Sequence, residues 1–365
     1  MTDGQHIRQL TGLRFLAAMW VVLYHYWPKM DGPALPGFVA KGYLGVELFF
    51  VLSGFILCHV YRQSVAEGGF RYGAFLWNRL ARVYPLHLAT LVGMIGLGLA
   101  AGAAGLAVDP GLTDWASLPA NLFLVQAWGV APSAAFNHPS WSISAEWFAY
   151  LSFPAFAWAS LALKDRPWLA TGLAAAFLVG LYAAFERLAG FPLTEATIRW
   201  GALRIVPCFA LGCALHALWR ARPASDRRSA LLMVLIAAVT VTLVASLHAP
   251  DALIVITLGG LILALARLGQ AGSELFGGRA FVYLGEVSYS IYMICIPWAI
   301  VFVNAAAKVL HLPEDRLPIP VWMVFFCSVV PLASASYHLI EKPARERMKL
   351  WADLWRTRRL AAAGA

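Results

Sequence analysis

Charged residues are scarce in this chain. Only 13% of its 365 residues are Asp, Glu, Lys or Arg, whereas 61% are hydrophobic, and its apolar runs match the length that a bilayer core requires. The net charge of +9 could suggest nucleic acid in a soluble protein, but here the basic residues fall mainly between apolar runs, so we expect no nucleic-acid partner. The composition therefore predicts a multi-pass protein of the lipid bilayer.

Cysteine is scarce too, and its spacing excludes the usual roles. The five cysteines lie within or at the ends of apolar runs and show no CxxC pair and no His-rich spacing, so we expect neither a disulfide nor a metal. The sequence also lacks an internal repeat, a low-complexity stretch and a soluble domain. Its first apolar run contains an arginine and has no small-residue cleavage site, which favours a retained span over a signal peptide.

The apolar runs predict an all-α polytopic integral membrane protein with about ten transmembrane helices. The expected spans are Leu10–Tyr26, Gly42–Val60, Tyr84–Leu106, Trp141–Leu163, Trp168–Phe185, Trp200–Trp219, Ala230–Leu247, Ala252–Ala266, Phe281–Asn304 and Val321–Ile340. Six basic residues fall on one side of these spans and twenty on the other. Since the basic side faces the cytoplasm, both termini are expected there. The expected organisation is one membrane domain over residues 1–345 and a basic cytoplasmic tail over 346–365.

The first apolar run carries two groups that a membrane helix normally excludes, Arg14 and His25. Their spacing of eleven residues places both on one face of a helix, about 16 Å apart along its axis. A buried arginine costs from about 2.5 to more than 10 kcal/mol, so such residues usually face a bundle interior or a water-filled cavity. We interpret this stripe as the wall of a polar path. Snorkelling of Arg14 to the headgroups and an aromatic-belt position for His25 stay open as alternatives.

Two acids lie within later runs, Glu47 in GVELFFVLSGFIL and Glu146 in SWSISAEWFAY. Because the first, second and fourth spans bring their outer ends to one side, both acids are expected at the depth of His25, where a carboxylate could orient or charge the imidazole. Arg204, inside the sixth run, is a candidate ion-pair partner for one of them.

Arg79 and Arg82 occur in the sequence FLWNRLARVYPLHL. A spacing of three places both on one side of a helix, where they could form a fork for phosphate. Positive-inside charge alone would account for their presence, but not for their pairing with Tyr84 and Pro85.

The order of these signatures resembles the membrane-bound acyltransferase-3 family, bacterial integral-membrane proteins that acylate extracytoplasmic polysaccharides, lipids and other acceptors. The matching segments are R-x10-H from Arg14 to His25, GVELFFVLSGFIL at Gly45–Leu57, R-x-x-R followed by Y-P at Arg79–Pro85, SWSISAEW at Ser140–Trp147, GEVSYSIYM at Gly285–Met293 and IEKPAR at Ile340–Arg345. Together they cover nearly the whole chain.

The resemblance implies a bacterial inner-membrane enzyme that transfers an acyl group from cytoplasmic acyl-CoA, most simply acetyl-CoA, to a hydroxyl of an extracytoplasmic glycan or glycolipid. It implies that activity depends on Arg14 and His25. It also implies a CoA site at Arg79 and Arg82, beside Tyr84. Our hypothesis is that His25 acts as general base, with Glu47 or Glu146 fixing its tautomer, and it stays open whether His25 instead briefly carries the acyl group. No metal is expected. Many members carry a histidine near the position of Cys295, so the role of that position is open. A homo-oligomer is left open as well.

A different class of function fits the same buried charges. In a proton-coupled transporter or flippase, Arg14, His25, Glu47 and Glu146 would form a relay. Transporters commonly show inverted repeats and broken helices, and no corresponding pair of interrupted segments is visible in the two halves of this sequence. The enzyme is therefore the favoured hypothesis.

Overall fold

The computed structural model describes residues 6–106, 110–221, 226–312 and 316–363, with side chains up to residue 354. The helices are α1 (Arg8–Tyr26), α2 (Gly37–Ala40), α3 (Gly45–Ala66), α4 (Tyr72–Ala103), α5 (Leu118–Leu122), α6 (Ser140–Leu151), α7 (Phe153–Ala162), α8 (Pro167–Ala189), α9 (Gly201–Ala221), α10 (Arg227–Ser246), α11 (Asp251–Gln270), α12 (Arg279–Leu310), α13 (Ile319–Ser336) and α14 (Lys342–Ala363). Two short strands, β1 (Met30–Asp31) and β2 (Leu317–Pro318), pair in parallel.

Eight of the described helical segments are long and apolar enough to cross a bilayer. They comprise α3 with the turn before it, α4, α8, α9, α10, α11, α12, and α13 continued into α14. The all-α polytopic membrane fold expected from the apolar runs is thereby confirmed. The count of ten spans and the cytoplasmic position of both termini stay predictions. Most side chains of the expected basic tail, those beyond residue 354, lie outside the described part of the chain.

The expected span Trp141–Leu163 is two helices rather than one. Helix α6 ends at Leu151 and α7 begins at Phe153, so the pieces have 12 and 10 residues, each too short to cross a bilayer alone. Pro154 explains the break, because it has no N–H for a helical bond and its ring clashes with the carbonyl four residues before it. The expectation of one continuous fourth span was therefore wrong.

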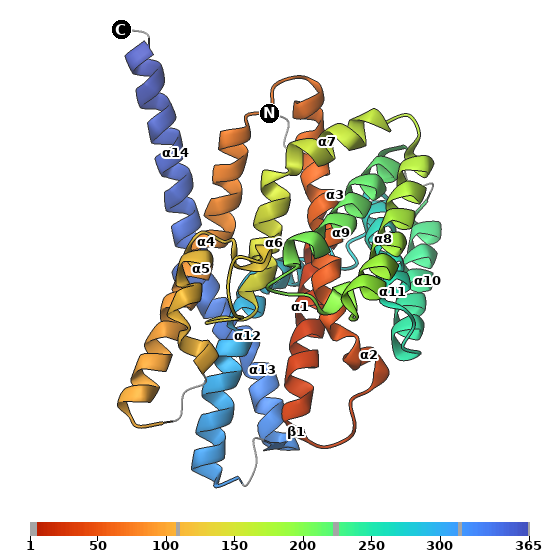
Figure 1. The fold of residues 1–365 in the computed structure, drawn as a ribbon. Helices are drawn as coiled ribbons and strands as arrows, with labels where there is room; N and C mark the ends of the chain where they lie inside the picture. Colours follow the sequence, from red (N-terminus) through yellow and green to blue (C-terminus); the bar gives the residue numbers. More distant parts are fainter. Residues whose placement is uncertain (1–5, 107–109, 222–225, 313–315, 364–365) are drawn as a thin grey trace.

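Helix α1 lies in the middle of the bundle, between α3 on one side and α12 on the other (Figure 1). Glycine permits the close approach of α1 and α12, because a Cβ at Gly285 would overlap the backbone carbonyl of Thr11. A Cβ at Gly212 would likewise overlap the carbonyl of Val51, which lets α9 approach α3. Small residues at such crossings allow the backbone contact that holds membrane helices together. These crossings fix the helices that carry Arg14 and Ser53.

Replacing Gly285 with alanine should lower the thermal stability of the protein by several degrees. The added methyl meets a backbone carbonyl that cannot rotate away, and overpacking of this kind costs about 1–3 kcal/mol. Gly96→Ala in α4 is the matched control, because a Cβ there meets no atom within 4 Å. Thermal unfolding of both variants in detergent measures the difference. Equal melting temperatures for the parent and Gly285→Ala would show that the crossing is looser than described.

The segment between α4 and α6 folds back along α4 instead of covering the end of the bundle. His87 Nε2 lies 2.8 Å from the carbonyl oxygen of Asn121 in α5, and His87 is sixteen residues, or about 24 Å, before the end of α4. Irregular backbone at membrane depth must be buried in protein and hydrogen-bonded, and the buried Asn121 and Gln126 donate to the carbonyls of Ser117 and Ser140. The segment is thus an inner part of the bundle.

The start of the same segment is held by Asp114. Its Oδ2 accepts hydrogen bonds from the hydroxyls of Ser133 at 2.5 Å and Ser117 at 2.9 Å, and these bonds hold the pKa of Asp114 below its usual value. The carboxylate therefore ties the two ends of the folded-back segment together.

The two ends of the bundle make the topology testable. The connection between α3 and α4 and the far end of α14 lie together at the top of Figure 1, whereas the β1–β2 pair lies at the opposite end. In spheroplasts, a membrane-impermeant maleimide should label Pro132→Cys, an exposed position of the folded-back segment, and should label Gly69→Cys, in the connection between α3 and α4, only after permeabilisation. The parent is the control, since its only exposed described cysteine is Cys327. Labelling in the reverse order would invert the assigned orientation.

Candidate active site

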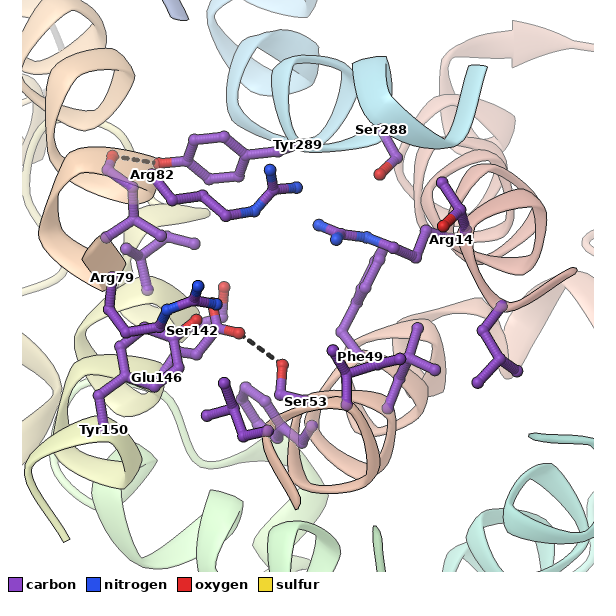
Figure 2. Close-up of a pocket in the computed structure, with 18 of the residues that line it drawn as sticks. Arg14, Phe49, Ser53, Arg79, Arg82, Ser142, Glu146, Tyr150, Ser288 and Tyr289 are labelled. Atoms are coloured by element: carbon purple, nitrogen blue, oxygen red, sulfur yellow. Dashed lines mark hydrogen bonds between the residues drawn. The ribbon is translucent and has the colours of Figure 1, made fainter. Parts of the chain in front are cut away.

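A cavity of about 200 Å³ lies among α1, α3, α4, α6 and α12. Its polar lining consists of His6, Thr11, Arg14, Ser53, His59, Arg79, Arg82, Ser142, Glu146, Tyr150, Ser288, Tyr289 and Tyr292. The rest of the wall is apolar and comes mainly from α3, including Phe49 (Figure 2). A cavity with a few convergent polar groups in an apolar wall is the usual form of a ligand site.

Three arginines from two helices extend into this cavity. Figure 2 shows Arg14 from α1 opposite Arg79 and Arg82 from α4. Within the described chain, the Nε atoms of Arg14 and Arg79 have no hydrogen-bond partner. The Nη2 of Arg79 donates to the hydroxyl of Tyr61 at 3.5 Å, and its guanidinium lies 5.7 Å from the centre of that ring. Like charges so close together in a low-dielectric site repel, which leaves the cavity suited to an anion.

Glu146 is the acid that lines the cavity. Its Oε1 accepts a hydrogen bond from the Ser53 hydroxyl at 2.5 Å, and it interacts electrostatically with Arg14. Glu341 also interacts electrostatically with Arg14 and Arg82, so two carboxylates face three guanidinium groups and positive charge remains in excess. An anionic ligand would balance it.

Arg79 and Arg82 lie on the same side of α4 and both line the cavity, as their spacing of three residues predicts. The hydroxyl of Tyr289 in α12 donates to the Val83 carbonyl at 2.6 Å and so fixes α4 against α12 next to Arg82. Tyr84 does not share this face, because two residues turn a helix by about 200°. Its hydroxyl donates to the Leu122 carbonyl at 3.1 Å, in α5, and the structure does not bring it to the cavity.

Glu47 is separated from Glu146 and lies in a different charged group. It forms a buried ion pair with Arg204, the candidate partner named from the sequence. The Arg204 guanidinium also donates to the Ala196 carbonyl at 2.9 Å and lies 4.6 Å from the centre of the Trp141 ring. Glu47 is thus held by a structural pair that also joins α3 to α9.

Glu146 lies deeper in the bundle than the level of His25 at which the sequence analysis placed it. The expectation assumed that the fourth span starts at the outer surface. Asn137, just before α6, donates to the carbonyl of Met293 at 2.9 Å, and Met293 is seventeen residues short of the end of α12. Helix α6 therefore begins within the bundle, and Glu146 lies beside the arginines rather than beside His25.

His25 lies near the opposite end of α1 from Arg14 and does not line the cavity. Helix α1 is continuous from Arg8 to Tyr26, as the stripe from Arg14 to His25 requires. The hydroxyl of Tyr26 donates to the Cys295 carbonyl at 2.8 Å, two residues from the carbonyl that binds Asn137. His138 is accordingly placed near His25, and the two interact electrostatically.

Sequence reasoning missed Glu341, which is 1% exposed and sits at the end of a π-helical turn, Tyr337–Glu341. Its Oε2 accepts from the Ser290 hydroxyl at 2.8 Å, and it interacts electrostatically with Arg82 and Arg14. The segment IEKPAR contains this acid, so the motif could be recognised in the sequence. The π-turn that directs Glu341 inward could not. Such π-turns often mark functional sites.

Comparison with known proteins identifies the family of the chain. The family model described as an acyltransferase domain matches residues 7–338. The chain belongs to the acyltransferase-3 family. It is 33% identical to "Acyltransferase MdmB" of Streptomyces mycarofaciens over 319 residues, which is 78% of this chain and 77% of that protein.

Two further relatives are more distant or shorter. The chain is 23% identical over 375 residues to "Peptidoglycan O-acetyltransferase OatA" of Listeria monocytogenes, covering 94% of this chain and 56% of that protein. It is 32% identical over 145 residues to "Protein 2 in picA locus" of Rhizobium radiobacter, covering 37% of this chain and 73% of that protein. No solved structure matches. Family membership supports an acyltransferase over the transporter hypothesis.

Proposed function

We propose that the protein transfers an acyl group, most simply acetyl, from cytoplasmic acyl-CoA to a hydroxyl of an extracytoplasmic glycan or glycolipid in the bacterial inner membrane. The observation that carries the proposal is the convergence of Arg14, Arg79 and Arg82 on one cavity. CoA offers a diphosphate, and paired arginines bind such groups bidentately. Glu146 would then be the counter-charge that holds the arginines in place while the donor is absent.

The reach of the donor fits the separation of the two candidate groups on α1. Arg14 and His25 are about 16 Å apart along the helix, close to half of a bilayer core of about 30 Å. An extended pantetheine arm has roughly this length, so phosphates at the arginines would place the thioester at the level of His25. Ser142 and Tyr292 line the cavity, and their hydroxyls are 2.9 Å apart. They offer polar contacts along that route.

The transfer itself needs one proton acceptor. In the proposed step, a ring nitrogen of His25 takes the proton from the acceptor hydroxyl while its oxygen bonds to the thioester carbonyl carbon. The carbon–sulfur bond then breaks, and the leaving thiolate receives the proton from the imidazolium. General base catalysis of this kind contributes about 100- to 10,000-fold. Glu47 is paired with Arg204 and Glu146 with Ser53, so His138 rather than either acid is the neighbour proposed to orient His25.

The relatives support the class of acceptor. MdmB is described as an acyltransferase and OatA as a peptidoglycan O-acetyltransferase. This chain spans about half of OatA, 56% of its length, so a sugar hydroxyl is proposed as the class of acceptor and peptidoglycan itself is not.

Release of CoA tests the proposal directly. Protein purified into nanodiscs is mixed with acetyl-CoA, with and without a crude glycan extract of the host, and free thiol is measured. We expect CoA release that depends on the extract, together with acetate esters on the glycan fraction. Absence of both CoA binding and acetyl transfer, in protein that remains folded, would contradict the function.

A further inference from the structure

A second group of polar and aromatic side chains lies beside the cavity, where α3 and α9 run together. It consists of His59 and Arg62 from α3 and His216, Trp219 and Arg220 from α9. The His59 ring is centred 5.7 Å from the His216 ring and 5.2 Å from the Trp219 ring. Spacings of three and four residues place these side chains on facing sides of the two helices. We refer to these five residues as the α3–α9 cluster.

The cluster buries polar atoms without partners. In the described chain, Arg62 Nε, His216 Nδ1 and Trp219 Nε1 are buried and have no hydrogen-bond partner. The residues that carry them are 9%, 1% and 9% exposed. An indole N–H and a guanidinium Nε–H can only donate, and a buried donor without an acceptor costs about 1–3 kcal/mol. A native structure keeps such donors where an acceptor from outside the chain completes them.

The charge of the cluster indicates what kind of acceptor fits. Arg62 and Arg220 are near enough to repel each other, and both interact electrostatically with His216. Cys58 and Asp165 also interact electrostatically with Arg62, and the carboxylate of Asp165 forms no ion pair with it in the described structure. Because two guanidinium groups face only one carboxylate, the cluster keeps an excess of positive charge that favours an anion.

The cluster and the arginine cavity are neighbours. His59 lines the cavity, and Tyr61, which accepts the hydrogen bond from Arg79, directly precedes Arg62 in α3. A ligand with phosphates at Arg79 could therefore extend past α3 into the cluster. A ligand that fills both places needs a second phosphate on a separate branch of the molecule, next to a ring system that the aromatic side chains of the cluster could contact.

We propose that the α3–α9 cluster binds the ribose 3′-phosphate of CoA, with Arg62 as the principal ligand and the Trp219 N–H as a second donor, while the arginine cavity binds the diphosphate. This rests on the proposed function, because it takes the donor to be a CoA thioester. A phosphate of an anionic lipid headgroup has the same chemistry, so the experiment separates the two sources.

Binding of CoA and 3′-dephospho-CoA to full-length protein distinguishes these outcomes. In nanodiscs of phosphatidylcholine alone, the parent should bind CoA about tenfold more tightly than 3′-dephospho-CoA, since one charge-assisted contact is worth about that factor. Arg62→Gln should abolish this preference, because it weakens the binding of CoA and leaves the binding of 3′-dephospho-CoA unchanged. Trp219→Phe, which keeps the ring and removes the N–H, should reduce the preference to about threefold. Arg71→Gln, at an exposed arginine before α4, is the control and should change neither ligand.

Three results would overturn the assignment. Equal affinity of the parent for CoA and 3′-dephospho-CoA means that the protein does not bind the 3′-phosphate. Equal weakening of both ligands by Arg62→Gln means that Arg62 acts through the fold. A thermal stabilisation by phosphatidylglycerol that Arg62→Gln abolishes, with CoA affinity unchanged, assigns the cluster to lipid. Failure of the parent to bind either CoA or 3′-dephospho-CoA instead contradicts the proposed function itself.

Discussion

His25→Ala should lose acyl transfer by at least about 100-fold while still binding CoA with parental affinity. His25 lies outside the arginine cavity, so its removal takes away the proton acceptor and leaves the donor's phosphate contacts intact. His25→Gln should be equally inactive, because an amide can hydrogen-bond but cannot carry the proton. Rates of CoA release at saturating acetyl-CoA, together with CoA binding, separate the two effects.

His338→Ala is the matched control for this prediction. His338, in the π-helical turn before α14, is exposed and packs its ring on that of Tyr283, whereas His25 is in the last turn of α1. It should keep parental activity. A His25→Ala variant within about tenfold of the parent would remove His25 from the mechanism and leave proton transfer to another group, with His138 as the first candidate because it interacts electrostatically with His25.

Arg79→Lys and Arg82→Lys should each raise the KM for acetyl-CoA by about tenfold, and the double variant should raise it further. Lysine keeps the positive charge but loses the planar pair of donors that binds a phosphate bidentately. If positive-inside charge were the only role of these arginines, lysine would serve equally well. Initial rates at subsaturating acetyl-CoA measure the change, and the cysteine-labelling pattern verifies that orientation is retained.

The control for this pair is Arg71→Lys, which changes an exposed arginine at the start of the same helix. It should leave the KM unchanged. Parental KM values for both Arg79→Lys and Arg82→Lys would show that the donor's phosphates bind elsewhere. Because Arg14 faces the same space, Arg14→Lys would then be the next variant to examine.

The sequence could predict what depends on helix periodicity. Apolar runs located the long helices, the spacing of three placed Arg79 and Arg82 on one face, and an arginine in an apolar run marked Arg14 as a residue of an interior polar space. Each of these depends only on neighbours along one helix. Arg204 was also recognised as a partner for a buried acid, although the choice of Glu47 over Glu146 needed the fold.

The rest depends on contacts between distant segments. The position of Glu146 follows from Pro154, which splits the fourth span, and from the inward course of residues 110–139, which starts α6 within the bundle. The inward direction of Glu341 follows from a π-turn that no periodic pattern reports. Tyr84 was assigned to the donor site by its place next to the arginine motif, whereas helix geometry turns it to α5.

The glycine crossing of α1 and α12 has a consequence for how the two compartments communicate. Helix α1 carries both Arg14 and His25, and its backbone meets that of α12 without an intervening side chain at Gly285. Such a contact opposes sliding or rocking of one helix on the other, a motion required of a carrier that exposes its site alternately to each side. In the proposed mechanism Arg14 and His25 would therefore stay in place, and the acyl group would move along α1 to cross the permeability barrier.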